Sequence, residues 1–156
     1  MNTFELFFSK VISVEGGYVF DSQDPGGETK YGISKRSYPK ENIKDITLDR
    51  AKEIYYRDYW MKCRCNDLPT PLDGYVFDAA VNQGVHSAII LLQRVLESTQ
   101  DGLIGPETLR KAKIAGKEVG SDYLTRRIMQ YTRTEGWLRY GVGWVRRVIS
   151  LATNIT

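Results

Sequence analysis

The sequence predicts a mainly helical protein with one small β-hairpin, and three observations lead to this fold class. Apolar residues recur at helical spacing over most of the 156 residues. Helix-start and helix-stop residues flank these stretches, as at Asn2, Thr47 and Gly84. Only residues 17–33 combine strand-forming residues with a glycine-rich turn. We therefore expect a helical bundle around a central buried helix, with the hairpin as the small sheet.

The first helix is expected from Asn2 to Val14, because Asn2 and Glu5 have the spacing of a capping box. Its apolar stripe consists of Phe4, Phe8, Val11 and Ile12. Glu15 continues this stripe, and an environment of low dielectric favours the protonated form of a carboxyl group. Gly16 and Gly17 then end the helix and leave the backbone open to a ligand. Glu15 is therefore either a candidate general acid or a solvated glutamate at a helix end.

Five further stretches have a helical pattern, and a sixth stands out by being apolar on nearly every side. The five are residues 47–60, 73–83, 106–115, 122–134 and 143–152, with Thr47 as a cap and Pro106 in a first turn. The sixth, residues 87–97, is predicted to be the central buried helix, because a helix that is apolar all round has no face for water.

The hairpin is expected to place residues 18–20 opposite Tyr31 and Ile33. Asp24 begins the turn sequence Asp24-Pro25-Gly26-Gly27, so its loop can fold back towards Glu15. Two carboxyl groups in unlike environments are the minimum that glycoside hydrolysis requires, one protonated and one ionised. The hydroxyl of Thr29 is then a candidate for orienting the attacking water.

Composition is that of a soluble globular protein, with 42% apolar and 26% charged residues. No apolar stretch approaches the length of a membrane span. Cys63 and Cys65 are interpreted as structural thiols, since a zinc site needs more ligands and His86 is the single histidine. The acidic residues around Asp24 match a calcium loop only loosely. We therefore expect no metal and no other cofactor.

Positive charge is concentrated after Ser121, where six arginines stand against two acidic residues. These are Arg126, Arg127, Arg133, Arg139, Arg146 and Arg147, interleaved with Trp137, Tyr140 and Trp144. Such a basic face can follow an anionic polymer. Nucleic acid is not expected, because the net charge is only +3 and no recognition motif is present. The apolar residues of the last helix either belong to the core or contact a membrane surface.

Two segments together resemble a known family. Glu15-Gly16-Gly17-Tyr18, Asp24 and residues 26–33 resemble the signature of the N-acetylmuramidases of glycoside hydrolase family 108, which consists largely of phage endolysins and related cell-wall lysozymes. Residues 73–84 and 101–109 resemble a predicted peptidoglycan-binding segment of the same family. The resemblance extends over roughly residues 4 to 150.

The resemblance implies one lysozyme-like domain over residues 1–156, with a catalytic half at 1–68 and a helical half at 69–156. It implies cleavage of the β-1,4 bond between N-acetylmuramic acid and N-acetylglucosamine in peptidoglycan. Glu15 would be the general acid, Asp24 the second carboxylate, and Thr29 the hydroxyl that positions water. No metal or organic cofactor is implied.

Four other residues are candidates for sugar binding. Asp78 and Asn82 lie four positions apart on one helix face, where they line a sugar cleft or hydrogen-bond to each other or to backbone. Tyr18 and Tyr31 either stack on sugar rings or pack in the hairpin.

Two other functions remain open. A lytic transglycosylase would use Glu15 alone and release 1,6-anhydro ends, and a non-catalytic wall-binding module would not need Glu15. The first fifteen residues lack the features of a secretory signal. We therefore expect a monomeric phage endolysin that stays in the host cytoplasm until a holin-like membrane protein releases it to the wall or periplasm. A prophage or effector origin fits equally well.

Overall fold

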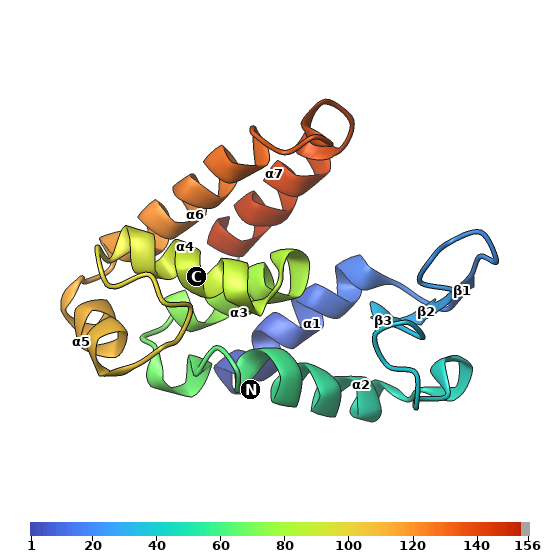
Figure 1. The fold of residues 1–156 in the computed structure, drawn as a ribbon. Coiled ribbons are helices and arrows are strands. Elements are labelled where there is room, and N and C mark those ends of the chain that lie inside the picture. Colours follow the sequence, from blue (N-terminus) through green and yellow to red (C-terminus); the bar gives the residue numbers. More distant parts are fainter. Residues whose placement is uncertain (154–156) are drawn as a thin grey trace. The chain divides into compact units, whose positions relative to one another are not determined.

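The computed structural model describes residues 1–153, and its regular structure consists of helices and one small sheet (Figure 1). The predicted fold class, mainly helical with a small β-structure, is confirmed. Contacts divide the chain into two compact units, Met1–Met61 and a second that begins at Lys62. The interpretation of residues 1–156 as one domain with halves at 1–68 and 69–156 stays a prediction.

Helix α1 (Thr3–Glu15) begins as the sequence predicts. The side chain of Asn2 accepts a hydrogen bond from the backbone N–H of Glu5 at 2.9 Å, and the Glu5 carboxylate accepts one from the Asn2 N–H at 3.4 Å. This reciprocal pair is the predicted capping box. The helix ends at Gly16, whose φ of 72° is readily available only to glycine.

Helix α2 (Leu48–Tyr55) continues into a π-helical turn, η2 (Tyr56–Trp60). Thr47 is its cap, as predicted, and accepts from the Arg50 N–H at 3.1 Å. Aromatic side chains join α1 to this helix: the rings of Phe8 and Tyr55 lie 5.7 Å apart. An ion pair between Lys52 and Glu5, at 2.6 Å, adds a surface contact between the same two helices.

The sheet has three antiparallel strands in the order β1-β2-β3, which are Val19–Phe20, Glu28–Lys30 and Ile33–Ser34. Val19 pairs with Thr29, so the predicted pairing of residues 18–20 with Tyr31 and Ile33 is wrong. Tyr31 and Gly32 instead form a second tight turn, between β2 and β3, with φ of 52° and 75°. Positive φ at both positions is what a type I′ hairpin turn requires. The glycine pair at residues 26–27 belongs to the longer loop between β1 and β2.

The second unit consists of five α-helices joined by short connections. They are α3 (Leu72–Gln83), α4 (Val85–Val95), α5 (Pro106–Ile114), α6 (Glu118–Tyr131) and α7 (Trp137–Thr153), and a short 3₁₀ turn, η3 (Cys65–Asp67), precedes them. The predicted helices are all present, but α7 begins before residue 143. Gly141 lies inside the helix. A Cβ atom at this position would lie 2.5 Å from the ring of Trp137, so the packing of that ring explains a glycine within the helix.

The fully buried helix is α3, and the prediction that residues 87–97 form it is wrong. All residues from Leu72 to Ala80 are buried. Helix α4 instead exposes His86, Ser87 and Arg94 to solvent. The prediction was wrong because acidic residues in α3 are typical of a solvent-exposed face, whereas the fold buries them.

One of these acidic residues, Asp78, lies in a buried charge cluster that joins three helices of the unit. Its carboxylate pairs with Arg127 of α6 at 2.7 Å and with Arg147 of α7 at 2.9 Å. Arg127 has no exposed side-chain surface and Arg147 only 9%. These two arginines therefore do not belong to the predicted basic face, which keeps only the exposed arginines at 126, 133, 139 and 146.

The loop between α4 and α5 is held by Gln93, which is completely buried. Its side-chain amide donates to the Asp101 carboxylate at 2.8 Å and to the Leu103 carbonyl at 2.9 Å. Its oxygen accepts from the Gly102 N–H at 3.0 Å. One glutamine thus fixes the Asp-Gly-Leu-Ile-Gly-Pro segment through three bonds.

Cys63 and Cys65 are buried free thiols, and burial raises the pKa of Cys65. This agrees with the structural role predicted for them. Of the helices formed by residues 1–153, none is long and apolar enough to cross a membrane. Val148 and Leu151 of α7 are buried, as expected for core residues.

Replacement of Asp78 by Asn is expected to lower the free energy of unfolding by about 3–5 kcal/mol, because it leaves two buried guanidinium groups without their counter-charge. Urea denaturation of the variant measures this change. Asp122→Asn, at an exposed position of α6, is the matched control, with an expected change within about 0.5 kcal/mol. Equal stability of the two variants would contradict the role assigned to the cluster.

Candidate active site

Glu15 is the last residue of α1 and is half-buried. Its side chain packs on Gly32: a Cβ atom placed on that glycine would lie 3.1 Å from both Cβ and Cγ of Glu15. The end of the first helix is therefore in contact with the turn between β2 and β3. This contact requires a residue without a side chain at position 32.

Tyr55 fixes the same turn from the other side. Its hydroxyl donates a hydrogen bond of 2.7 Å to the carbonyl of Tyr31, and it too lies against Gly32. The ring of Tyr55 is 98% buried and stacks on Tyr59, with 5.4 Å between ring centroids. Glu15 and Tyr55 thus meet over one glycine.

Tyr59 lies close enough to Glu15 for the charge of the carboxylate to affect the pKa of the tyrosine. Burial is the main reason that the pKa of Tyr59 is raised, and the negative charges of Asp58 and Glu15 raise it further. The π-helical turn that carries Tyr59 follows directly on Tyr55. Such turns are frequent at functional sites, because the wider turn changes which side chains share a face.

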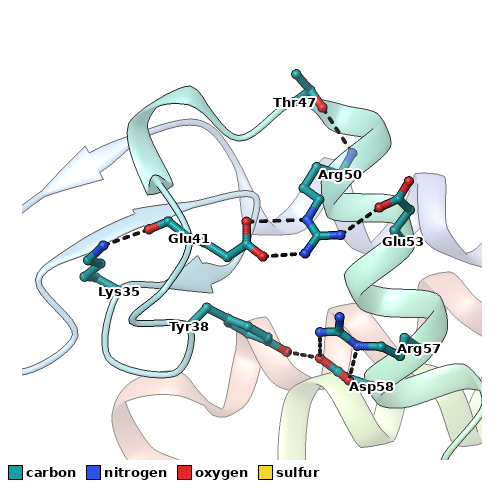
Figure 2. Close-up of polar contacts among 8 residues, drawn as sticks. All are labelled: Lys35, Tyr38, Glu41, Thr47, Arg50, Glu53, Arg57 and Asp58. Atoms are coloured by element: carbon teal, nitrogen blue, oxygen red, sulfur yellow. Dashed lines mark hydrogen bonds and ion pairs between the residues drawn. The ribbon is translucent and has the colours of Figure 1, made fainter.

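Asp58 of the same turn is held by two partners, which Figure 2 shows. The hydroxyl of Tyr38 donates to its carboxylate at 2.9 Å, and Arg57 pairs with it at 2.7 Å. Burial, followed by the neighbouring Tyr59 and Asp58, raises the pKa of Tyr38, so this phenol stays protonated and remains a donor. The turn is in this way joined to the segment that follows the sheet.

A second ion network fixes the connection between β3 and α2 (Figure 2). Arg50 binds the Glu41 carboxylate through two nitrogens, at 2.5 and 3.4 Å, and Glu53 at 2.8 Å. The hydrogen bond from Arg50 holds the pKa of Glu41 below its ordinary value. Lys35 donates to the Glu41 carbonyl at 2.8 Å, which closes the loop on itself. This network is only partly buried and is interpreted as a support of the site, not as part of its chemistry.

Asp24 lies at the other end of β2, in the exposed loop 21–27. One oxygen of its carboxylate accepts from the Gly26 N–H at 2.8 Å, and its carbonyl accepts from the Gly27 N–H at 2.9 Å. The loop therefore positions the carboxylate through its own backbone. Asp24 lines an open hollow of about 490 Å³ that Lys35 and Arg36 border. The surroundings of the Asp24 loop are therefore polar, with two cationic side chains at the border of the hollow.

Thr29 is the central residue of β2, paired with Val19 on one side and Ser34 on the other. It therefore lies between the loop of Asp24 and the turn that contacts Glu15. The structure brings all three predicted catalytic residues to one small sheet of the first unit.

The two predicted sugar-binding tyrosines lie on the same sheet. Tyr18 is 40% exposed, and its hydroxyl donates to Glu28 of β2 at 2.9 Å. Tyr31 occupies the β2–β3 turn, with the Lys30 ammonium 5.4 Å from its ring centroid. Sugar stacking by either ring stays a prediction.

Asp78 and Asn82 lie in the second unit, within the buried cluster of α3, α6 and α7. The side-chain oxygen of Asn82 accepts a short hydrogen bond from Tyr131 and a longer one, 3.4 Å, from Arg127. Their partners are thus side chains of other helices, neither each other nor the backbone. A contact of either residue with sugar remains a prediction.

Sequence reasoning missed the tyrosines around Glu15. A helix was expected over residues 47–60, but nothing in its pattern indicated the π-helical turn that carries Tyr59. Tyr38 and Glu28 were also missed, although Glu28 stands beside Thr29 in the signature segment. Within residues 1–153, no group of three or more His, Cys, Asp and Glu side chains is arranged to hold a metal ion.

Comparison with known proteins identifies relatives of the chain. Residues 8–84 match the family described as Glycosyl hydrolase 108. The fold is similar to that of SagA from Brucella abortus, with a TM-score of 0.84 and 32% sequence identity. This match covers 96% of the chain and 91% of SagA. No curated protein matches the sequence. The predicted lysozyme-like, mainly helical fold agrees with these findings.

Gly32→Ala is expected to destabilise the protein more than Gly27→Ala does. Both glycines have positive φ, 75° and 66°, so both variants carry a backbone cost of about 1–2 kcal/mol. Only at Gly32 does the added methyl meet Tyr55 and Glu15, which adds about 1–3 kcal/mol of overpacking, whereas Gly27 has open space. Chemical denaturation of the two variants compares them. Equal losses would show that the contact with Glu15 is unimportant to the fold.

Tyr55→Phe is expected to lower the free energy of unfolding by about 1–3 kcal/mol, because the Tyr31 carbonyl loses its partner in a partly buried place. The freed turn also moves relative to Glu15, so peptidoglycan hydrolysis should fall by about tenfold. Turbidity loss of cell-wall suspensions measures the rate. Tyr140→Phe, on the exposed surface of α7, is the control, and a rate equal to that control would refute a positioning role.

Proposed function

Since the chain belongs to glycosyl hydrolase family 108, we propose that it hydrolyses the β-1,4 bond between N-acetylmuramic acid and N-acetylglucosamine. The family establishes a glycoside hydrolase of the muramidase type that acts on peptidoglycan. The choice of bond is the part proposed here. The observation that carries the proposal is the packing of Glu15 on Gly32, in the turn whose Tyr31 carbonyl accepts a hydrogen bond from Tyr55.

Glu15 is proposed as the general acid. At the end of a helix, half-buried and packed on the bare backbone of Gly32, its carboxyl group lies where a proton donor can face the glycan. It donates its proton to the bridging oxygen while the glycosidic bond breaks and positive charge develops on the sugar ring. Gly16 and Gly17 follow it without side chains, which leaves room for a sugar beside the carboxyl group.

Asp24 and Thr29 are proposed to act on the water. Asp24 lies in a polar loop and lines a hollow that Lys35 and Arg36 border. Its negative charge stabilises the oxocarbenium-like state, and together with the Thr29 hydroxyl it directs water to the anomeric carbon. Tyr18 and Tyr31 border the same sheet and are proposed to stack on the glycan.

Two other reactions give different products and so remain testable. A lytic transglycosylase needs only the acid and closes the sugar on itself, which leaves 1,6-anhydro ends. A wall-binding module releases nothing. The fixed orientation of the Asp24 carboxylate on its loop favours hydrolysis, because a transglycosylase has no use for a second carboxylate there.

The biological role is also proposed. The resemblance of the Glu15–Ile33 segment to phage endolysins supports a monomeric enzyme that accumulates in the host cytoplasm and reaches the wall through a holin-like membrane protein. Expression in bacteria with and without such a membrane protein tests this role. Lysis that requires co-expression supports it, and lysis by the enzyme alone contradicts it.

Glu15→Gln is expected to lower the rate of peptidoglycan hydrolysis by about 10²–10⁴-fold, the typical contribution of a general acid. Asp24→Asn should also lower the rate strongly while the loop stays folded, because the new amide oxygen still accepts from Gly26. Mass spectrometry of released muropeptides measures both effects, and reducing N-acetylmuramic ends identify the bond cleaved.

Asp21→Asn serves as the matched control, since Asp21 accepts a similar backbone bond from Gln23 within the same loop. It should retain a rate near that of the unaltered enzyme. Full activity of Glu15→Gln would remove Glu15 from the mechanism. Anhydro ends would identify a transglycosylase instead.

A further inference from the structure

A hollow of about 330 Å³ lies between α4 and α6 of the second unit, and none of the residues assigned to catalysis lines it. Its lining combines three basic residues with apolar and amide side chains: Leu91, Arg94, Arg126, Met129, Gln130 and Arg133. No acidic residue lines it. A neighbouring hollow of about 420 Å³ differs in this respect, because Glu97, Glu118 and Asp122 there offset Arg110 and Lys111.

The three arginines of this hollow are available for an external anion. Arg94 donates to the neutral side chain of Gln100 at 3.0 Å, a bond that holds it in place without neutralising it. Within residues 1–153, no acidic side chain forms an ion pair with Arg94, Arg126 or Arg133. The adjacent Arg127 shows the contrast, since its charge is committed to Asp78 inside the unit.

The spacing along α6 gathers these groups on one face. Arg126, Met129 and Gln130 are three or four residues apart on α6, so their side chains share one face beside α4, and Arg133 reaches the same hollow from the turn that follows the helix. Met129 is 52% exposed, so its thioether is available for an apolar contact. The surface therefore places several guanidinium groups around the apolar side chain of Met129.

This combination selects a ligand with several carboxylates separated by small apolar groups. A guanidinium binds a carboxylate through two parallel hydrogen bonds, and Met129 contacts methyl groups. Peptidoglycan is the substrate of the family, and its stems of the diaminopimelate type carry carboxylates on D-glutamate and diaminopimelate between alanine residues. Unsubstituted poly(glycerol phosphate) meets the charge requirement but has no methyl groups for Met129.

We propose that the hollow between α4 and α6 binds the carboxylate-bearing peptide stems of peptidoglycan. This site is additional to the one that cleaves the glycan. Engagement of a stem would retain the enzyme on the wall between cleavage events and raise the local concentration of glycan. The proposal rests on the peptidoglycan substrate and not on the role of Glu15.

Titration of the intact protein with a free stem tetrapeptide, L-alanyl-D-glutamyl-diaminopimelyl-D-alanine, tests the site by calorimetry. The peptide contains no glycosidic bond, so its binding is independent of catalysis. The double variant Arg126→Gln and Arg133→Gln should bind about tenfold more weakly, since two charge-assisted contacts are lost. The matched control, Arg139→Gln with Arg146→Gln, removes equal charge from exposed positions of α7 and should bind within about twofold of the unaltered protein.

Two further titrations complete the design. The same peptide with its carboxyl groups amidated should show no binding. Poly(glycerol phosphate) should bind more weakly than the free peptide. Thermal unfolding and hydrolysis of glycan strands stripped of peptide should be unchanged in the Arg126/Arg133 variant.

Several results would overturn the proposal. Absence of peptide binding by the unaltered protein removes the site, and equal weakening of both double variants reduces it to general charge attraction. Undiminished binding of the amidated peptide excludes carboxylate recognition, and tighter binding of poly(glycerol phosphate) transfers the site to teichoic phosphate. Loss of activity on glycan strands without peptide would instead assign the arginines to the hydrolytic reaction.

Discussion

The candidate active site depends on one contact, the packing of the Glu15 side chain on the bare backbone of Gly32. The contact exists because a two-residue turn with positive φ presents a glycine to the helix end. The Tyr55 hydroxyl holds that turn by donating a hydrogen bond to its Tyr31 carbonyl. The aromatic packing of α1 against α2 places Tyr55 there. Capping, helix packing and turn geometry in the first unit therefore all converge on the position of one carboxyl group.

Local signals predicted the helices well, because caps and stop residues act within a few positions of the chain. The capping box at Asn2 and Glu5 and the Thr47 cap are present as predicted. Strand pairing was wrong because two glycine-containing turns lie close together, and sequence does not reveal which one closes which pair. The buried helix was misassigned because the acidity of α3 is concealed by the arginines that pair with Asp78, which come from distant positions.

The predicted catalytic residues lie in the small sheet, in its β1–β2 loop and at the helix end that contacts its β2–β3 turn, yet their surroundings were only partly predicted. Glu15, Asp24 and Thr29 form a short signature in sequence, so a single segment was enough to indicate them. The tyrosines that border Glu15 come from α2 and from a π-helical turn, whose hydrogen bonds leave no mark on residue spacing. The arginine face was predicted too broadly, since sequence does not separate Arg127 and Arg147, which serve the interior, from Arg126 and Arg133, which line the hollow.

The buried cluster around Asp78 has a consequence for the order of events during synthesis. Glu15, Gly32 and Tyr55, which form the contact at the end of α1, all lie within residues 1–61. Asp78, in contrast, receives its second guanidinium from Arg147 on α7. A nascent second unit consequently carries an incompletely paired interior until that helix has been translated, and during this interval its helices are open to proteases and chaperones.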